Sequence, residues 1–409
     1  MKLFSHRAVL YIIVIFFIFD AFIVNAELLN FEQIKQKTLN KNPSLSAGNS
    51  AIRAAEAKIK QANVIPNPEL EIGFENFGKD EFEVVLTQPV EIGGKRKARI
   101  ELARKDLCTA ELKSDAIRLG LEAEIIRRCL PILGLQKKIA VLDSLALIMK
   151  ESLNGIKRRR QAGAAMEADT LRAEIELDEL LMEKATLNRQ LNRYKNELAA
   201  LWGNTDDAEI ELACALNTSI FLPSKKEIQK KILDHPEMKL MKLNEETVAA
   251  EIRQLKAEAF PELAISCGYL RNNEDDENTV IAGMSISLPF FDRNKGAILS
   301  KSHEAAAARK EFQAFYLERM KEAGSILSEI ENTTEVFSVL AEKLQPKAKN
   351  VYALLERYYK LGNISILEVL ESRRNLLEIN LRYIDLITEN AFLAADLMEL
   401  SGIPIQIVY

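Results

Sequence analysis

Residue types that often act as metal ligands or catalytic groups, such as histidine and cysteine, are scarce in this chain. Its 409 residues include three histidines, four cysteines and one tryptophan, and aromatic residues make up 7% of the total. His6 lies in the leader segment discussed below, and His235 and His303 stand alone in the sequence. A zinc site needs three or four His, Cys or carboxylate ligands close together. We therefore expect neither a metal site nor a cofactor.

The cysteines are too few and too scattered to form a framework. Cys108 and Cys129 are expected on one helix, about 31 Å apart at 1.5 Å per residue, so they cannot form a disulfide within one chain. Cys214 and Cys267 complete the set, and no CxxC spacing occurs. We interpret all four as small buried or lipid-facing residues, with a redox or zinc role as the alternative.

Other function classes are disfavoured by what the chain lacks. There is no Ser/His/Asp set and no glycine-rich phosphate loop, so an enzyme is not expected. The net charge is −5, with acids and bases interspersed, which argues against nucleic acid as a partner. Beyond residue 26 no long apolar run occurs, which excludes a helical inner-membrane transporter.

Residues 1–26 have the pattern of a secretory signal peptide. Lys2 and Arg7 come first, an apolar core runs from Ala8 to Phe19, and Ala26 ends a stretch suited to cleavage. The alternative is a retained membrane anchor, but this apolar core is short for a spanning helix. We expect cleavage, and export of the mature chain.

What is present begins with a hairpin, in strands at about 68–77 and 81–90. Leu70, Ile72 and Phe74 alternate with acidic residues, as side chains do along a strand. Gly78-Lys79-Asp80 supplies the turn. Each strand has about ten residues, enough to cross a bilayer in a tilted barrel, and a face of carboxylates suits a watery lumen. The candidate lumen-facing acids are Glu69, Glu71, Glu75 and Glu83; a barrel interior is polar in any case, so cation selection is one of two interpretations.

The chain is two copies of one unit. Pro43 and Pro236 are 193 residues apart, as are Pro68 and Pro261, and Gly163 matches Gly362 at an offset of 199. We expect a first repeat at 27–203, a link at 204–223 with a possible short strand, and a second repeat at 224–409. The second hairpin has strands at about 261–271 and 279–289, with a turn seven residues longer.

Long helices follow each hairpin. We expect them at about 95–160 and 166–202, and at about 295–345 and 347–402, with breaks at Gly163 and Gly362 that turn antiparallel pairs. Apolar residues recur in steps of three and four, with gaps at Ser114 and Lys184. This spacing favours coiled-coil packing over an ordinary helical bundle.

Four strands per chain cannot close around a lumen, and an open sheet edge is not tolerated in lipid. Other copies of the chain must therefore complete the barrel. Three chains would give 12 strands, which lies inside the usual range. The predicted fold is mainly α with a β-barrel part.

The segments QPVEIGGKRKARI (88–100) and SLPFFDRNKGAI (287–298), with the duplicated Asn/His-Pro and PEL signals, resemble the TolC family of outer membrane efflux channels. They are most similar to its CzcC branch, the outer membrane components of cobalt-zinc-cadmium exporters. The resemblance implies a homotrimeric channel-tunnel in the outer membrane that extends into the periplasm. Its implied partners are a periplasmic adaptor (membrane fusion) protein, an inner-membrane RND-type pump and outer membrane lipid.

The resemblance also implies a periplasmic gate. Glu368 and Glu371 fall where acidic ring residues occur, Tyr359 where a linking tyrosine occurs, and Asp169 where its carboxylate partner occurs. Ring positions here are Glu rather than Asp, and Ile364 replaces an arginine that can serve the latch. From the residues alone, two carboxylates three apart share a helix face, and three-fold symmetry would make two stacked rings; a solvated helix face is the alternative. The expected adaptor-docking tips are Arg158, Arg159, Arg160, Gly163 and Gly362; ordinary exposed charge at helix tips is the alternative for the three arginines.

Two other functions stay open at this point. An outlet for drugs or secreted proteins would share the architecture. A periplasmic coiled-coil scaffold without a pore would share the helices, but it gives no purpose to four alternating strands of about ten residues.

Overall fold

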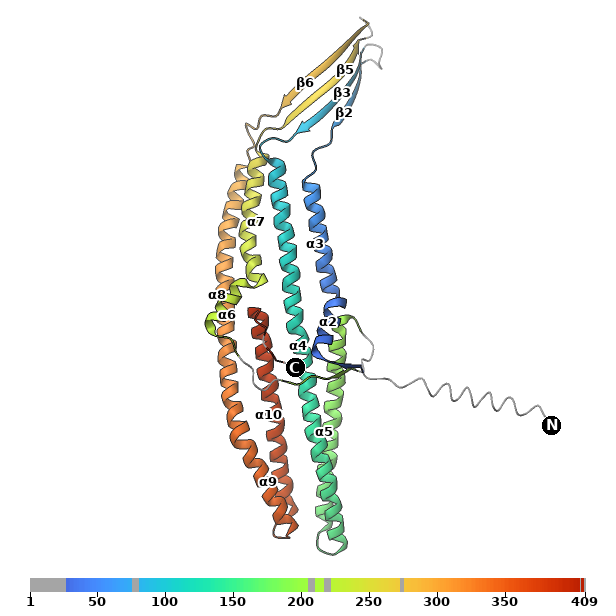
Figure 1. The fold of residues 1–409 in the computed structure, drawn as a ribbon, viewed down its shortest axis with the longest axis vertical. Coiled ribbons are helices and arrows are strands. Elements are labelled where there is room, and N and C mark those ends of the chain that lie inside the picture. Colours follow the sequence, from blue (N-terminus) through green and yellow to red (C-terminus); the bar gives the residue numbers. More distant parts are fainter. Residues whose placement is uncertain are drawn as a thin grey trace, which may run out of the picture.

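A four-stranded sheet at one end of the molecule continues into a long shaft of helices in a computed structural model of the chain (Figure 1). The structure describes residues 27–75, 81–204, 210–216, 222–272, 276–404 and 406–407. The predicted signal peptide and the turn at Gly78–Asp80 lie outside these ranges. No helix in the described ranges is both long enough and apolar enough to cross a membrane.

Both repeats have the same order of elements, as predicted. The first comprises α2 (Phe31–Lys41), α3 (Pro43–Ala62), β2 (Glu69–Glu75), β3 (Glu81–Val90), α4 (Lys95–Gln161) and α5 (Glu167–Ala199). The second comprises α6 (Lys225–Asp234), α7 (Pro236–Glu258), β5 (Leu263–Asn272), β6 (Glu277–Ile286), α8 (Lys295–Val339), α9 (Gln345–Lys360) and α10 (Ile366–Ser401). Two short strands, β1 (Glu27–Leu29) and β4 (Ile210–Leu212), pair in parallel, and β4 lies in the predicted link.

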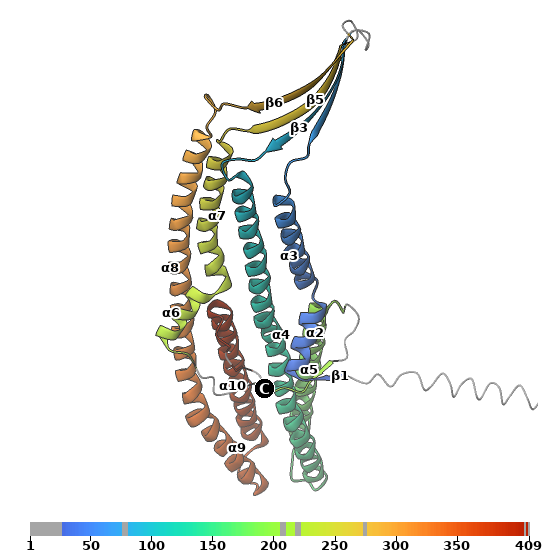
Figure 2. The same ribbon diagram turned by 45° about the horizontal axis from the view of Figure 1, so that its top comes forward.

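In the shaft, two shorter helices of each repeat lie end to end along its longest helical segment. α3 and α5 follow one another along α4, and α7 and α10 follow one another beside α8 and α9 (Figures 1 and 2). The same local signals start α3 and α7, because each begins with proline after a capping residue. The Asn42 side chain accepts a hydrogen bond from the Ser44 amide at 2.9 Å, and His235 Nδ1 accepts one from the Glu237 amide at 3.3 Å.

The four long strands form one antiparallel sheet in the order β2-β3-β5-β6. The register places Ile72 opposite Val84 and Val84 opposite Tyr269, so one face is almost entirely apolar. The other face carries all four acids predicted for the lumen, since Glu83 lies opposite Gly73, between Glu71 and Glu75. Strands β2 and β6 are the edges of the sheet within this chain.

Left-handed residues make the corners where strands meet helices. Gly94 has φ +79° before α4, and Asn294 has φ +56° at the equivalent place before α8. Gly93, with φ +70°, also has the Phe260 side chain against it; a Cβ there would lie 2.3 Å from Phe260 Cγ. Only glycine satisfies both demands at residue 93.

The predicted apolar seams are interrupted for structural reasons. At Ser114 of α4 the backbone of the neighbouring helix α3 comes close at Gly48, and a small side chain fits there. A Cβ added to Gly48 would lie only 3.2 Å from Ser114 Oγ. At Lys184 of α5 the side chain instead forms an ion pair with Asp143 of α4. α4 continues through Pro131 without a break.

Two expectations from the sequence are wrong. The second repeat does not change helices near Pro346: α8 continues through a π-helical turn at Leu340–Leu344 into α9, and the break comes at 361–365. The wider turn accommodates the proline, which lies at the start of α9, where its missing N–H costs little. Cys108 is exposed on α4 rather than buried, whereas Cys129 is fully buried.

Candidate functional site: the tip of the helical shaft

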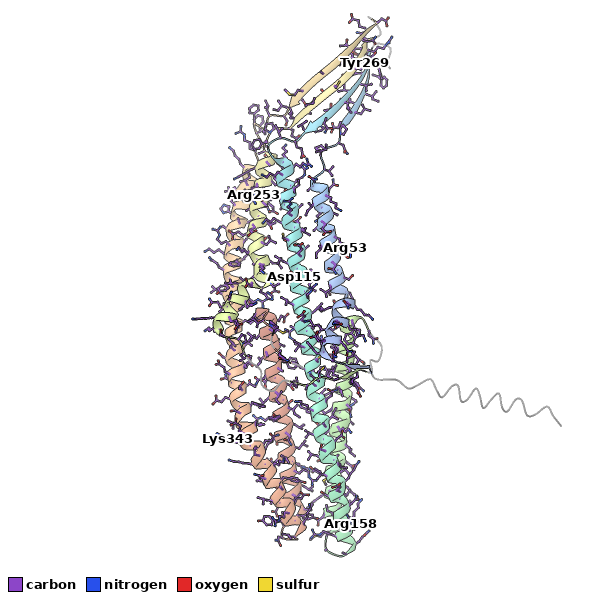
Figure 3. The ribbon with its side chains drawn as sticks, viewed as in Figure 1. Arg53, Asp115, Arg158, Arg253, Tyr269 and Lys343 are labelled. Atoms are coloured by element: carbon purple, nitrogen blue, oxygen red, sulfur yellow. The ribbon has the colours of Figure 1, made fainter. Side chains whose placement is uncertain are left out.

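The two helix turns at the end of the shaft are built alike. Gly163 and Gly362 have φ of +74° and +81°, and each ends a helix in a left-handed residue. The Ala164 amide donates to the Arg159 carbonyl at 2.8 Å, and the Asn363 amide donates to the Tyr358 carbonyl at 3.0 Å. Arg158 lies at this end of the shaft, far from Tyr269 in the sheet (Figure 3).

Arg159 connects the two turns. Its Nη1 donates to the Tyr359 carbonyl at 3.0 Å, and its guanidinium lies 4.9 Å from the centre of the Tyr359 ring. Charge-assisted hydrogen bonds and cation–π contacts are both favourable in partly buried places. Arg159, which the sequence assigned to docking alone, is therefore also a link between the repeats.

Tyr359 and Asp169 lie in the same neighbourhood. Burial raises the pKa of Tyr359, the negative charge of Asp169 raises it further, and the Arg159 guanidinium opposes both by lowering it. The Asp169 carboxylate accepts a hydrogen bond from the Met166 amide at 3.2 Å, which caps the first turn of α5. Tyr359 and Asp169, two of the four predicted gate residues, are thus near enough to interact electrostatically, and Arg159 contacts Tyr359 directly.

Glu368 and Glu371 are exposed in the first turns of α10. At 3.6 residues per turn they lie about 60° apart around the helix, so they share one face. Neither forms an ion pair with a residue that the structure describes. Glu368 follows Gly362 by six residues, as Asp169 follows Gly163. Glu368 and Asp169 therefore occupy equivalent positions in the two repeats, but only the Asp169 side chain bonds the cap of its own helix.

The remaining docking candidates make few contacts. Arg158 Nε donates to the Asn154 carbonyl of its own helix at 3.3 Å, and Arg160 lies 3.9 Å from the Glu167 carboxylate. Both leave most of their charge at the surface. A basic surface around two matching helix turns is able to contact another protein.

A feature that the sequence did not single out is Arg373 on α10. It is 2% exposed, and it borders a cavity of about 430 Å³ between α4, α9 and α10. The neighbouring Arg374 is mostly exposed and pairs with Glu176 at 2.7 Å and with Glu179 at 2.9 Å. The helical spacing does separate them, because Arg373 continues the buried series Ile366, Val369 and Leu376 on one face of α10, whereas Arg374 lies at the edge of that face.

The side chains described at the tip do not form a cluster of metal ligands. Among the residues that the structure describes, no group of three or more His, Cys, Asp or Glu side chains is arranged to hold a metal ion. The carboxylates at the tip are spread over separate helices, and so they offer electrostatic attraction rather than coordination.

Comparison with known proteins identifies relatives along nearly the whole chain. The model of the family described as "Outer membrane efflux protein" matches residues 34–204 and 228–402. The cobalt-zinc-cadmium resistance protein CzcC of Cupriavidus metallidurans is 26% identical over 358 residues, covering 87% of this chain and 86% of that protein. The nickel and cobalt resistance protein CnrC of the same organism is 22% identical and covers 75% of this chain and 74% of that protein.

Solved structures share the fold. A crystal structure of CusC superposes with a TM-score of 0.74 at 15% identity, covering 90% of this chain and 91% of that chain. The outer membrane protein VceC of Vibrio cholerae gives 0.72 at 18% identity, covering 91% of this chain and 95% of that chain. At these identities the likeness concerns the fold alone.

Proposed function

We propose, from the premise that this chain belongs to the outer membrane efflux protein family, that three copies form one channel carrying heavy-metal cations out of the periplasm. The observation that carries the proposal is the two-faced sheet joined to the shaft. One face is mostly apolar, the other bears Glu69, Glu71, Glu75 and Glu83, and both edges lack a partner strand among the residues that the structure describes. In a bilayer such a sheet must close on itself.

Closure by three copies fits the dimensions of the sheet. β3, β5 and β6 each have ten residues, which suits a tilted membrane strand. Twelve strands would put the apolar face towards lipid and the acidic face towards water. The helices below would continue the lumen as a tunnel, and the channel would perform no covalent chemistry.

Cations are the proposed cargo for two reasons. The relatives that match by sequence are metal-resistance proteins. Repeated by three-fold symmetry, the four acids of the sheet would also give a negative lumen, which raises the local concentration of cations. A channel for drugs would have the same fold, so only the transported compound distinguishes the two functions.

The tip is proposed to be the gate and the docking site. Glu368 and Glu371 would form two carboxylate rings, and Tyr359 with Asp169 and Arg159 would hold the two helix turns together when the tunnel is closed. An adaptor would contact the tips around Arg158, Arg159, Arg160, Gly163 and Gly362. The adaptor would pass on cargo from an inner-membrane pump.

Deletion of this chain from the cell that makes it tests the cargo. We expect deletion to raise cell-associated zinc, cobalt or cadmium several-fold and to lower the metal concentration that stops growth, while drug tolerance stays unchanged. Complementation with the wild-type chain should restore export. A variant with Glu69, Glu71, Glu75 and Glu83 all changed to Gln should restore it incompletely. Unchanged metal tolerance together with a loss of drug tolerance would assign the channel to drugs instead.

A further inference from the structure

Arg373 is a buried cation without a matching anion. Its Nη2 donates to the Tyr352 hydroxyl at 3.3 Å and to the Ser152 hydroxyl at 3.4 Å, and its Nη1 contacts the Met149 sulfur. Its Nε has no hydrogen-bond partner, and among the described residues no carboxylate forms an ion pair with it. The guanidinium also lies 5.5 Å from the centre of the Tyr352 ring, which compensates its charge only in part. A buried charge that lacks a counter-ion is costly, so an arginine kept in this position indicates a counter-ion from outside the chain.

The cavity beside Arg373 is positively charged. Its charged lining residues are Arg158, Arg159, Lys360, Arg373, Glu151 and Glu356. Four cations thus face two carboxylates, and Glu356 is already engaged with Lys360 at 3.1 Å. The surplus positive charge favours an anion in this space.

The cavity is also too large and too apolar for a small anion alone. Its volume is about 430 Å³, whereas one water takes about 30 Å³ of the liquid. Ile156, Ile366 and Val369 form apolar parts of its wall. A carboxylate attached to an aliphatic stem would satisfy both the charged part and the apolar part.

The direction of the cavity follows from the helix geometry of α10. Ile366, Val369 and Arg373 line the cavity, while Glu368 and Glu371 lie on the exposed arc of the same helix. At 3.6 residues per turn, the mean directions of these two sets differ by about 160°. If the two acids face the tunnel lumen, the cavity lies on the side of α10 turned away from it. A protein bound outside the tunnel would reach that side.

We infer that this cavity receives an acidic side chain, Glu or Asp, from the protein that docks at the tip of the shaft. Its carboxylate pairs with Arg373 after passing the basic rim of Arg158, Arg159 and Lys360, and its stem packs on Ile156 and Val369. The inference rests on the proposed function, because it names the chemistry of the partner at the proposed docking tip. Both helix turns contribute to the rim, so docking there would contact the two repeats together.

A peptide pair tests the inference on the full mature protein in mild detergent. The probe is a labelled alanine-rich helical peptide with a single central glutamate, and its match carries glutamine there. By fluorescence anisotropy, we expect the glutamate peptide to bind about tenfold more tightly, a difference of 1.4 kcal/mol. Arg373→Met should abolish the difference and Arg373→Lys should keep part of it. The control Arg309→Gln, an exposed arginine on α8, should leave it unchanged.

Three results would overturn the inference. The first is equal binding of the two peptides to the wild-type protein. The second is Arg373-dependent binding of inorganic phosphate without any preference for the glutamate peptide, which would make this a small-anion site. The third is binding of the glutamate peptide only after the oligomer dissociates, which would assign the cavity to a neighbouring copy of the chain.

Thermal unfolding and conductance separate this inference from related failures. Replacing an unpaired buried charge by an apolar side chain of similar length is expected to be neutral or stabilising, so Arg373→Met should unfold at the wild-type temperature or above. A clearly lower temperature would make Arg373 a structural residue. A wild-type protein that conducts ions but shows no peptide preference rejects this inference alone, whereas one that does not conduct rejects the proposed function.

Discussion

The corner between sheet and shaft offers a sharp test, because two adjacent left-handed glycines differ in the space around them. Gly93 and Gly94 have φ of +70° and +79°. A Cβ on Gly93 would meet Phe260 Cγ at 2.3 Å, whereas a Cβ on Gly94 would find nothing within 4 Å. Gly94→Ala should therefore cost only the left-handed backbone, about 1–2 kcal/mol. Gly93→Ala should add a steric clash of about 1–3 kcal/mol, for a total of about 2–5 kcal/mol.

Urea unfolding of the detergent-solubilised protein, followed by far-ultraviolet circular dichroism, measures the difference. Phe260 is 52% exposed and lies beyond the end of α7, so Phe260→Gly alone should change stability little. In Gly93→Ala the Phe260→Gly change should relieve the clash, because it removes both the ring and the Phe260 Cβ, which would lie 2.4 Å from the new Cβ; in Gly94→Ala it should recover nothing. Phe260→Ala keeps that Cβ and should relieve the clash much less. Equal losses for the two glycine variants, or no recovery by Phe260→Gly, would refute the assignment of the corner to this contact.

Two further predictions concern the tip and the start of α7. Arg159→Gln removes a charge-assisted hydrogen bond to the Tyr359 carbonyl, worth about 1.5–3 kcal/mol, so closed channels should open more often in bilayer recordings. The matched control is Arg158→Gln, because the Arg158 side chain bonds only its own helix. Equal opening of the two variants would contradict the link. Burial lowers the pKa of His235 below its usual 6.5, so the unfolded chain binds the proton more readily and stability should fall as pH drops below 6.5. His235→Asn keeps a capping acceptor and should flatten that dependence in thermal unfolding, and an unchanged pH profile would contradict it.

Most of the fold was predicted from two patterns, the alternation of side chains along the strands and the repeat of motifs at a constant offset. Glu83 could be placed on the face of Glu71 because side chains alternate strictly along paired strands. Gly163 and Gly362 could be placed at turns because they are the same position in the two repeats, and a left-handed helix end favours glycine. Both inferences use residues that are near in sequence or related by the repeat.

The failures came at one local change of helix type and where contacts between distant segments decide the outcome. Pro346 looked like a helix boundary, but a π-helical turn before it absorbs the proline. The Arg159 contact joins residues 200 apart in the chain, and no periodicity within a single helix announces it. Burial of Arg373 beside exposed Arg374 depends on packing between α4, α9 and α10.

The central claim is that this chain forms a cation-selective pore closed by carboxylate rings at its tip. Single-channel recording of the purified mature protein in a planar bilayer tests it most directly. The control Glu167→Gln removes an exposed acid from the neighbouring helix turn. We expect cation-selective openings from the wild-type protein and from this control, and a wider opening with reduced selectivity from the Glu368→Gln/Glu371→Gln double variant. Absence of conductance from the wild-type protein, or identical selectivity in the double variant, would contradict the account.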